Sequence, residues 1–262
     1  MARTHGVCPV LSPQRVAAAL NGYRDNLDSA ALWADASWSA LPDNGWREAL
    51  SRASSAARRA CSQALARAAG VREPPFGAFA TPAVLGTGGA GVQPAPGGPK
   101  PNLALLDALP VSQALAVLRM RSLSFRRVEV RRLIDKQTRS RLADWTGVHP
   151  DAIAQDAHAA DAPDVAHLAM KTGLPPLARL DATAMAAEGW LLFVRDAGGA
   201  AEAADSANPA DRRRPSLTRL ALPRAFAPPA SLPAASGLDA AGSIRLFARM
   251  PDLLPEVAWL FG

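Results

Sequence analysis

The sequence predicts a mainly α-helical protein, an irregular bundle of several helices with long Pro/Gly-rich linkers. Hydrophobic residues make up 49% of the 262 residues, and Ala and Leu, the strongest helix formers, dominate them. The chain has a single Tyr and very few Ile, whereas strands are enriched in aromatic and β-branched residues. A helical fold interrupted by loops therefore explains the composition better than a sheet.

Residues 1–71 predict a helical hairpin. Ser12-Pro13 is typical of an N-cap followed by the first helical position. Apolar residues then recur at spacings of three and four, at Val16, Leu20, Tyr23 and Leu27. This helix should end in the region 33–38, and a second should run from Trp46 to a C-terminal stop at Gly70.

Three further boundaries follow from composition. Residues 72–101 hold seven Pro and seven Gly and predict a flexible linker, and residues 195–237 predict low-complexity loops. Between them, residues 102–194 form the predicted helical core, and residues 238–262 the predicted C-terminal helix. Because short apolar runs do not distinguish helix from strand, residues 190–194 and 217–222 could instead pair as one small β-ribbon.

The positive charge of the chain is concentrated in one segment. From Arg119 to Arg141 there are eight Arg and one Lys against Glu129 and Asp135, a net charge of +7, while the whole chain carries +6. Such a concentration indicates a site rather than a general polycation. We call residues 119–141 the arginine-rich block.

Three functions could use the arginine-rich block. A solvated helix surface is the simplest. Membrane binding is disfavoured because Arg recurs on nearly every side of the helix and interrupts its apolar arc. Protein recognition fits better, since guanidinium groups bind carboxylates bidentately and Arg and Trp are enriched at interface hot spots. Phe125, Val128, Leu133, Ile134, Leu142 and Trp145 are then expected to pack inward.

We assign protein interaction to the cations of this block and to the apolar end of the chain. The predicted interaction residues are Arg119, Arg121, Arg126, Arg127, Arg131, Arg132, Trp259 and Phe261. No catalytic, cofactor or metal residue is predicted, because the common catalytic and nucleotide-binding motifs are missing from the sequence. The Gly-rich run 86–91 has no following Lys-Ser/Thr pair, and three histidines, His149, His158 and His167, are spaced on opposite helix faces.

The main alternative is a DNA-binding regulator. Residues 138–153 reproduce the pattern of a helix-turn-helix, with Gly147 at the turn. The presumptive recognition helix, however, would present Asp151, Asp156 and Asp161 and no cation, although phosphate contacts rely on cations. A secretion chaperone is a third possibility, which the basic helical block disfavours. With two cysteines, no signal-peptide core and no membrane-spanning run, we expect a cytosolic protein.

The block LRMRSLSFRRVEVRRLIDKQTRSRLADWTG at positions 118–147 resembles the signature of type III secretion accessory proteins of the SctK kind, particularly Hrp-type members. Residues 31–43 and 255–262 are also similar to such proteins. The resemblance implies a non-enzymatic, mostly helical adaptor at the cytoplasmic face of the inner membrane. Its implied partners are the C-ring protein of the sorting platform and the cytoplasmic domain of the inner-membrane ring protein. Nucleic acid is not an expected partner, and the membrane would be reached through protein contacts only.

Overall fold

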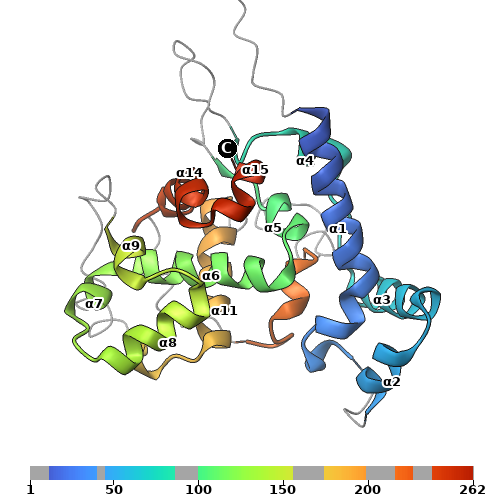
Figure 1. The fold of residues 1–262 in the computed structure, drawn as a ribbon, viewed down its shortest axis with the longest axis horizontal. Coiled ribbons are helices and arrows are strands. Elements are labelled where there is room, and N and C mark those ends of the chain that lie inside the picture. The colour runs from blue at the N-terminus through green and yellow to red at the C-terminus, as the bar shows by residue number, and fades with distance from the viewer. Residues whose placement is uncertain are drawn as a thin grey trace, which may run out of the picture.

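The computed structural model describes residues 12–39, 45–85, 100–155, 174–198, 216–226 and 238–261. Within these ranges the protein is a mainly α-helical bundle, as the composition predicts (Figure 1). The helix α6 (Val111–Phe125) lies at its centre, and nine of its 15 residues are buried. A helix that is apolar on most sides must be enclosed by other elements, and this one is.

The N-terminal helices begin and end at the predicted capping residues. The hydroxyl of Ser12 accepts a hydrogen bond from the Arg15 amide, 3.4 Å away, and starts α1 (Pro13–Trp33) with Pro at its first turn. A short 3-10 turn, η1 (Ala36–Trp38), follows. The predicted second helix is broken into α2 (Trp46–Arg52) and α3 (Ser55–Ala69) because Ser54 caps a new helix, which stops at Gly70 in the left-handed conformation.

The Pro/Gly-rich segment contains short ordered elements where it is described. Helix α4 (Phe76–Ala80) buries Phe79, and the strand β1 (Val84–Leu85) pairs antiparallel with β2 (Lys100–Pro101). The side chain of Asn102 then donates hydrogen bonds to the Ala78 carbonyl, at 2.8 Å, and to the Thr81 hydroxyl, at 3.0 Å. These bonds attach the segment to the helical core.

The alternative β-ribbon at residues 190–194 and 217–222 is wrong. Residues 190–194 belong to α11 (Ala182–Asp196), whose N-cap Asp181 accepts from the Ala184 amide at 2.7 Å. Residues 218–221 form the 3-10 turn η4 (Thr218–Ala221), held to α5 (Ala104–Ala108) because buried Asp107 accepts hydrogen bonds from the Leu217 and Thr218 amides. The apolar residues 190–194 lie inside this capped helix, where their backbone hydrogen bonds are made within the helix, and no strand partner is required.

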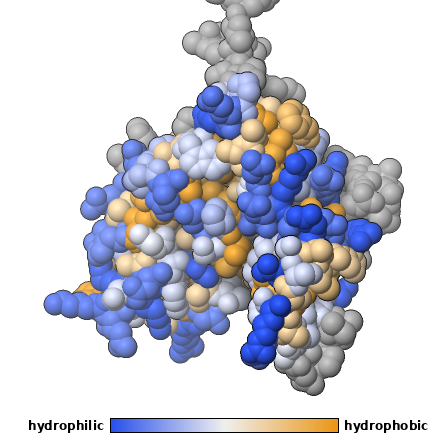
Figure 2. Space-filling view, turned by 45° about the vertical axis from the view of Figure 1, so that its right-hand side comes forward, coloured by the Kyte–Doolittle hydropathy of each residue, from blue (hydrophilic) through white to orange (hydrophobic). Residues whose placement is uncertain are grey.

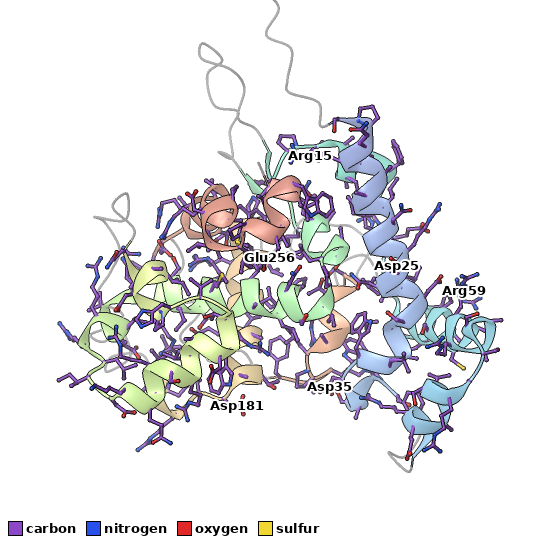
Figure 3. The ribbon with its side chains drawn as sticks, in the orientation of Figure 1. Arg15, Asp25, Asp35, Arg59, Asp181 and Glu256 are labelled. Carbon is purple, nitrogen blue, oxygen red and sulfur yellow. The ribbon has the colours of Figure 1, made fainter. Side chains whose placement is uncertain are left out.

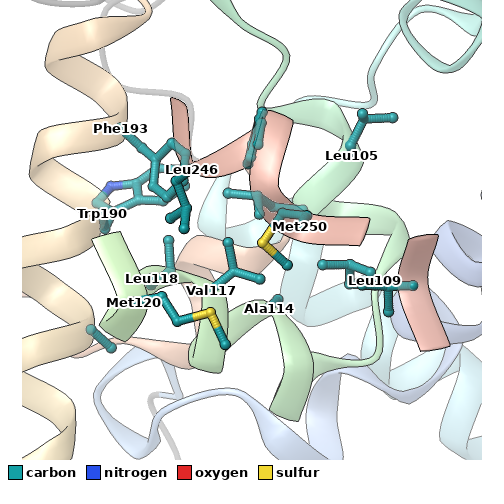
Figure 4. Packing of buried hydrophobic residues seen from close by; sticks show 14 of the residues in the cluster. Leu105, Leu109, Ala114, Val117, Leu118, Met120, Trp190, Phe193, Leu246 and Met250 are labelled. Atoms are coloured by element: carbon teal, nitrogen blue, oxygen red, sulfur yellow. The ribbon is translucent and has the colours of Figure 1, made fainter. Parts of the chain in front are cut away.

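The remaining elements surround α6. They are α7 (Arg127–Arg132), α8 (Lys136–Thr146), α9 (Pro150–Ala154), η2 (Leu177–Arg179), α14 (Gly242–Leu253), η5 (Pro255–Val257) and α15 (Ala258–Phe261). Helices α6, α11 and α14 enclose the centre of the core (Figure 4). Its labelled members are Leu105, Leu109, Ala114, Val117, Leu118, Met120, Trp190, Phe193, Leu246 and Met250.

Two ends of the molecule are separated by this core. Helices α7 and α8 lie at one end of the longest axis, and α2 and α3 lie at the other (Figure 1). Asp35, just after α1, sits beside η4, where its amide donates to the Leu220 carbonyl at 2.7 Å (Figure 3). No described helix is long and apolar enough to cross a membrane.

Candidate functional site

The arginine-rich block is divided by the fold into a buried half and an exposed half. Arg121, Arg126 and Arg127 are buried at the end of α6 and the start of α7. Arg131 and Arg132 lie at the exposed end of α7. The same cluster in sequence therefore has two different physical roles.

Arg121 joins three elements through a fully buried set of charges. Its guanidinium lies 2.7 Å from Asp239 and 2.9 Å from Asp196, and its Nε donates to the hydroxyl of Ser243, also at 2.9 Å. A side chain at Gly242 would overlap this guanidinium, so the close approach requires glycine. Arg121 thus connects α6 to the end of α11 and the start of α14.

Arg126 forms the second buried cross-link. Two of its nitrogens lie 2.6 Å from the two carboxylate oxygens of Glu188 on α11, and a third contact reaches Glu129 at 3.1 Å. Burial alone would lower the pKa of Arg126, but Glu188 and then Glu129 raise it above its ordinary value. Its charge is therefore retained inside the protein, as a bidentate pair requires.

Three of the six arginines predicted to contact a partner are not at the surface of the folded chain. Arg121 and Arg126 are fully enclosed, and Arg127 is buried with a nitrogen 3.7 Å from Asp239. They are enclosed because carboxylates distant in sequence, on α11 and before α14, neutralise them. A lone acidic residue in the apolar run ATAMAAEGWLLFV, Glu188, was the sequence signal for such a pair.

Arg119 is half-buried and also acts within the fold. Its Nε donates to the Ala182 carbonyl at 3.1 Å, and its Nη1 donates to the Trp145 carbonyl at 3.0 Å. The second contact satisfies a carbonyl of the last turn of α8, where a cation is favourable. Burial lowers the pKa of Arg119 from its ordinary value.

The exposed half forms what we call the basic end: Arg131, Arg132, Ile134, Lys136 and Arg141. Ile134 is 91% exposed, which corrects the prediction that it packs inward. The reason is that α7 ends at Arg132 and α8 starts at Lys136, so the intervening turn directs Leu133 toward the core instead. The chain therefore presents a large apolar side chain among cations.

The acidic groups at this end are largely engaged in local contacts. Asp135 caps α8: it accepts hydrogen bonds from the Thr138 hydroxyl, the Thr138 amide at 2.9 Å and the Gln137 amide at 3.1 Å, and these bonds, the hydroxyl first, lower its pKa. Asp151 pairs with Arg139. Asp144, on the exposed side of α8, is the remaining acidic residue of that helix. The exposed surface is thus dominated by cations.

Two cations of the basic end also support its shape. The Arg131 guanidinium donates to the Ala154 carbonyl at 2.9 Å. The Arg141 guanidinium lies 5.1 Å from the ring centre of Trp145, a cation–π contact. Trp145 is half-buried and packs against the core, so the inward packing predicted for it is met in part.

Of the two predicted C-terminal interaction residues, one is buried and one is exposed. Phe261 is buried, with its ring centre 5.0 Å from that of Phe247, and it belongs to the core. Its assignment to a partner surface is therefore corrected. Trp259 is 39% exposed and remains a predicted contact.

The helix-turn-helix alternative is not supported. Gly147, with φ of 72°, ends α8 as predicted, but the following helix, α9, spans only Pro150–Ala154 and ends at its C-cap Gln155. Pro150, Ile153 and Ala154 are buried, so this helix is used for packing rather than for entering a groove.

The other candidate sites in the sequence gain no support in the parts of the chain described. Those parts contain no group of three or more His, Cys, Asp or Glu arranged to hold a metal. His149 is the N-cap of α9, accepting from the Asp151 amide at 3.4 Å. His158, His167 and the Gly-rich run 86–91 lie outside the described residues.

Comparison with family models decides the broad identity. The model described as bacterial type III secretion protein (HrpB4) matches residues 11–256, nearly the whole chain. The chain belongs to the HrpB4 family. The resemblance seen in positions 118–147 to Hrp-type secretion proteins is thereby confirmed. No curated protein and no solved structure matches this HrpB4-family chain.

Proposed function

We propose that this HrpB4-family chain is a non-enzymatic adaptor of the type III secretion apparatus at the cytoplasmic face of the inner membrane. It links the C-ring protein of the sorting platform to the cytoplasmic domain of the inner-membrane ring protein. The observation that carries the proposal is the basic end. There, exposed cations flank Ile134 along the chain, while the buried arginines of the same block are neutralised internally.

The chemistry of the basic end favours an acidic protein surface as its partner. Arg side chains bind carboxylates in a planar, bidentate geometry, and a central apolar residue adds contact area from which water is excluded. Arg131, Arg132 and Lys136 provide the charge, and Ile134 provides the apolar centre.

The shape of the molecule is suited to an adaptor. A link between two proteins requires two faces that can be occupied at once, and the basic end and the α2–α3 end are separated by the whole core (Figure 1). The buried ion pairs fix the helices between these ends, so that a partner bound at one end has a defined position relative to the other.

Charge reversal at the basic end should weaken partner binding without unfolding the protein. The double variant Arg131→Glu/Arg132→Glu is expected to lose about 10-fold or more in affinity for one platform partner, mainly through like-charge repulsion. Both side chains are exposed, and the hydrogen bond from Arg131 to the Ala154 carbonyl is lost, so the free energy of unfolding of the variant should fall by no more than about 1–2 kcal/mol. Calorimetric titration with each purified partner and denaturant unfolding measure the two effects.

A matched control has the same change in charge elsewhere. Arg52 and Arg224 are also exposed, on α2 and after η4, and their double reversal should leave that affinity within about twofold. Equal loss in both variants would indicate nonspecific electrostatics. Unchanged binding and secretion in the Arg131/Arg132 variant would remove the basic end from the proposed function.

A further inference from the structure

A groove opens at the end of the molecule opposite the basic end. Two adjoining hollows of about 610 and 450 Å³ lie between α1, α3 and the segment leading into α4. They share four lining residues, Tyr23, Leu27, Gln63 and Glu73, and so form one continuous trough. We call this trough the α1–α3 groove.

The floor of the groove is apolar and follows one helix. Leu20, Tyr23 and Leu27 lie along α1 at helical spacing, and Phe79 packs beneath with its ring centre 5.7 Å from that of Tyr23. Burial first, and then the charges of Asp107 and Glu73, raise the pKa of Tyr23 above its ordinary value. The floor therefore stays uncharged and is suited to an apolar side chain.

The rim carries an exposed aromatic side chain and an incompletely covered helix. Phe76 lines the groove and is 66% exposed. Only Ser62 and Ala66 of the 15 residues of α3 are buried. An exposed aromatic beside an apolar floor is the arrangement expected of an interface anchor that lacks its partner.

The charge of the rim favours an acidic occupant. Helix α3 contains Arg58, Arg59 and Arg67 but no Asp or Glu (Figure 3 shows Arg59 at its surface). The two acids of the lining are Asp28 and Glu73, and Asp28 is already engaged by Arg59 at 2.7 Å and Gln63 at 3.3 Å.

The remaining charged residues near the rim belong to α1 and to the turn after α3. Arg24 lines the groove, and Asp25 and Arg72 are the sequence neighbours of the lining residues Arg24 and Glu73. Figure 2 brings this side of the molecule forward, and there apolar and strongly hydrophilic patches lie beside one another. With Arg24 and Arg67 also in the lining, its three arginines outnumber its two carboxylates, and the groove combines an apolar floor with a wall of net positive charge.

We propose that the α1–α3 groove binds an amphipathic α-helix of the second platform partner, the one not bound at the basic end. One bulky apolar side chain of that helix sits over Tyr23 beside Phe76, and its acidic flank lies along α3. Two helices packed side by side provide a trough for a third, and helix-in-groove binding uses anchors at this spacing. The inference rests on the proposed adaptor function and specifies its second contact.

The experiment uses the full-length chain, the purified C-ring protein and the purified cytoplasmic domain of the inner-membrane ring protein. The test variants are Phe76→Asp and Arg67→Glu, both at exposed side chains, so circular dichroism should show an unchanged fold. Each variant should weaken binding of the same single partner by about 10-fold or more and leave the other within about twofold. Ile134→Asp, at the opposite exposed apolar residue, is the matched control and should affect the other partner.

The outcomes separate the two proposals. If the native chain binds both partners and both groove variants bind them normally, the groove inference fails and the adaptor function stands. If Phe76→Asp instead alters self-association in sedimentation experiments, the groove is a contact between copies and the inference also fails. If the native chain binds neither partner, the adaptor function itself fails, and the groove inference fails with it.

Discussion

Replacing Glu188 by Ala should lower the free energy of unfolding by about 3–5 kcal/mol, the cost of removing one member of a buried ion pair. Glu188 binds Arg126 through both carboxylate oxygens and accepts a hydrogen bond from Ser122 at 2.7 Å. Without it, a fully enclosed guanidinium keeps only Glu129 and the Pro175 carbonyl. The loss arises because the buried charge keeps one carboxylate contact and two of the guanidinium nitrogens, Nε and Nη2, lose their acceptor; lost packing is the smaller effect.

Urea unfolding of three variants measures this effect. Glu188→Gln keeps the size of the side chain and one acceptor, so the protein should remain folded and its free energy of unfolding should fall by less than that of Glu188→Ala. Glu48→Ala removes an equivalent pair with Arg52 at the surface, where both side chains are exposed, and should cost less than about 1 kcal/mol. A Glu188→Ala protein as stable as the Glu48→Ala protein would contradict a structural role for the buried pair.

The second large effect is expected at Gly189, in the middle of α11. A Cβ atom there would lie 1.8 Å from the carbonyl oxygen of Leu118 on α6, a distance that no rotamer change relieves because both groups are fixed to backbone. Gly189→Ala must therefore separate the two central helices. We expect the free energy of unfolding to fall by about 3 kcal/mol or more, which is at or above the upper end of the usual cost of overpacking.

Gly77 provides the control for this substitution. It lies in α4, and a Cβ atom added there would have no heavy atom within 4 Å. Gly77→Ala should be neutral or stabilise by up to about 1 kcal/mol, because Ala has the higher helix propensity. Thermal unfolding of both variants distinguishes the cases; equal melting temperatures would show that α6 and α11 do not cross as closely as the structure indicates.

Local signals in the sequence predicted the helical class and several helix ends correctly. Ser12-Pro13, Gly70 and Gly147 each act through the backbone of one turn, so neighbouring residues contain all the information needed. The break at Ser54 was missed because the apolar stripe continues across it. A stripe reports which face is buried and does not show whether the helix is continuous.

The burial of the arginines was not predictable from the cluster itself. Arg126 pairs with Glu188, 62 residues away, and Arg121 pairs with Asp239, 118 residues away. Counting charge within residues 119–141 treats each cation as facing solvent, while the neutralising carboxylates lie on elements that only the fold brings near. Ile134 was misassigned because its place in a turn, and not its hydropathy, determines its exposure.

The position of Arg126 immediately before α7 has a consequence for genetic studies of this protein. Buried Arg126 and the exposed end of α7 are separated by only a few positions. Mutation at either place would therefore produce the same secretion-deficient phenotype. Mutants at Arg126 should lose secretion because the steady-state level of the protein falls, whereas mutants at the exposed Lys136 should lose secretion at a normal protein level. Immunoblotting alongside each secretion assay is therefore needed to test the proposed docking surface of this protein.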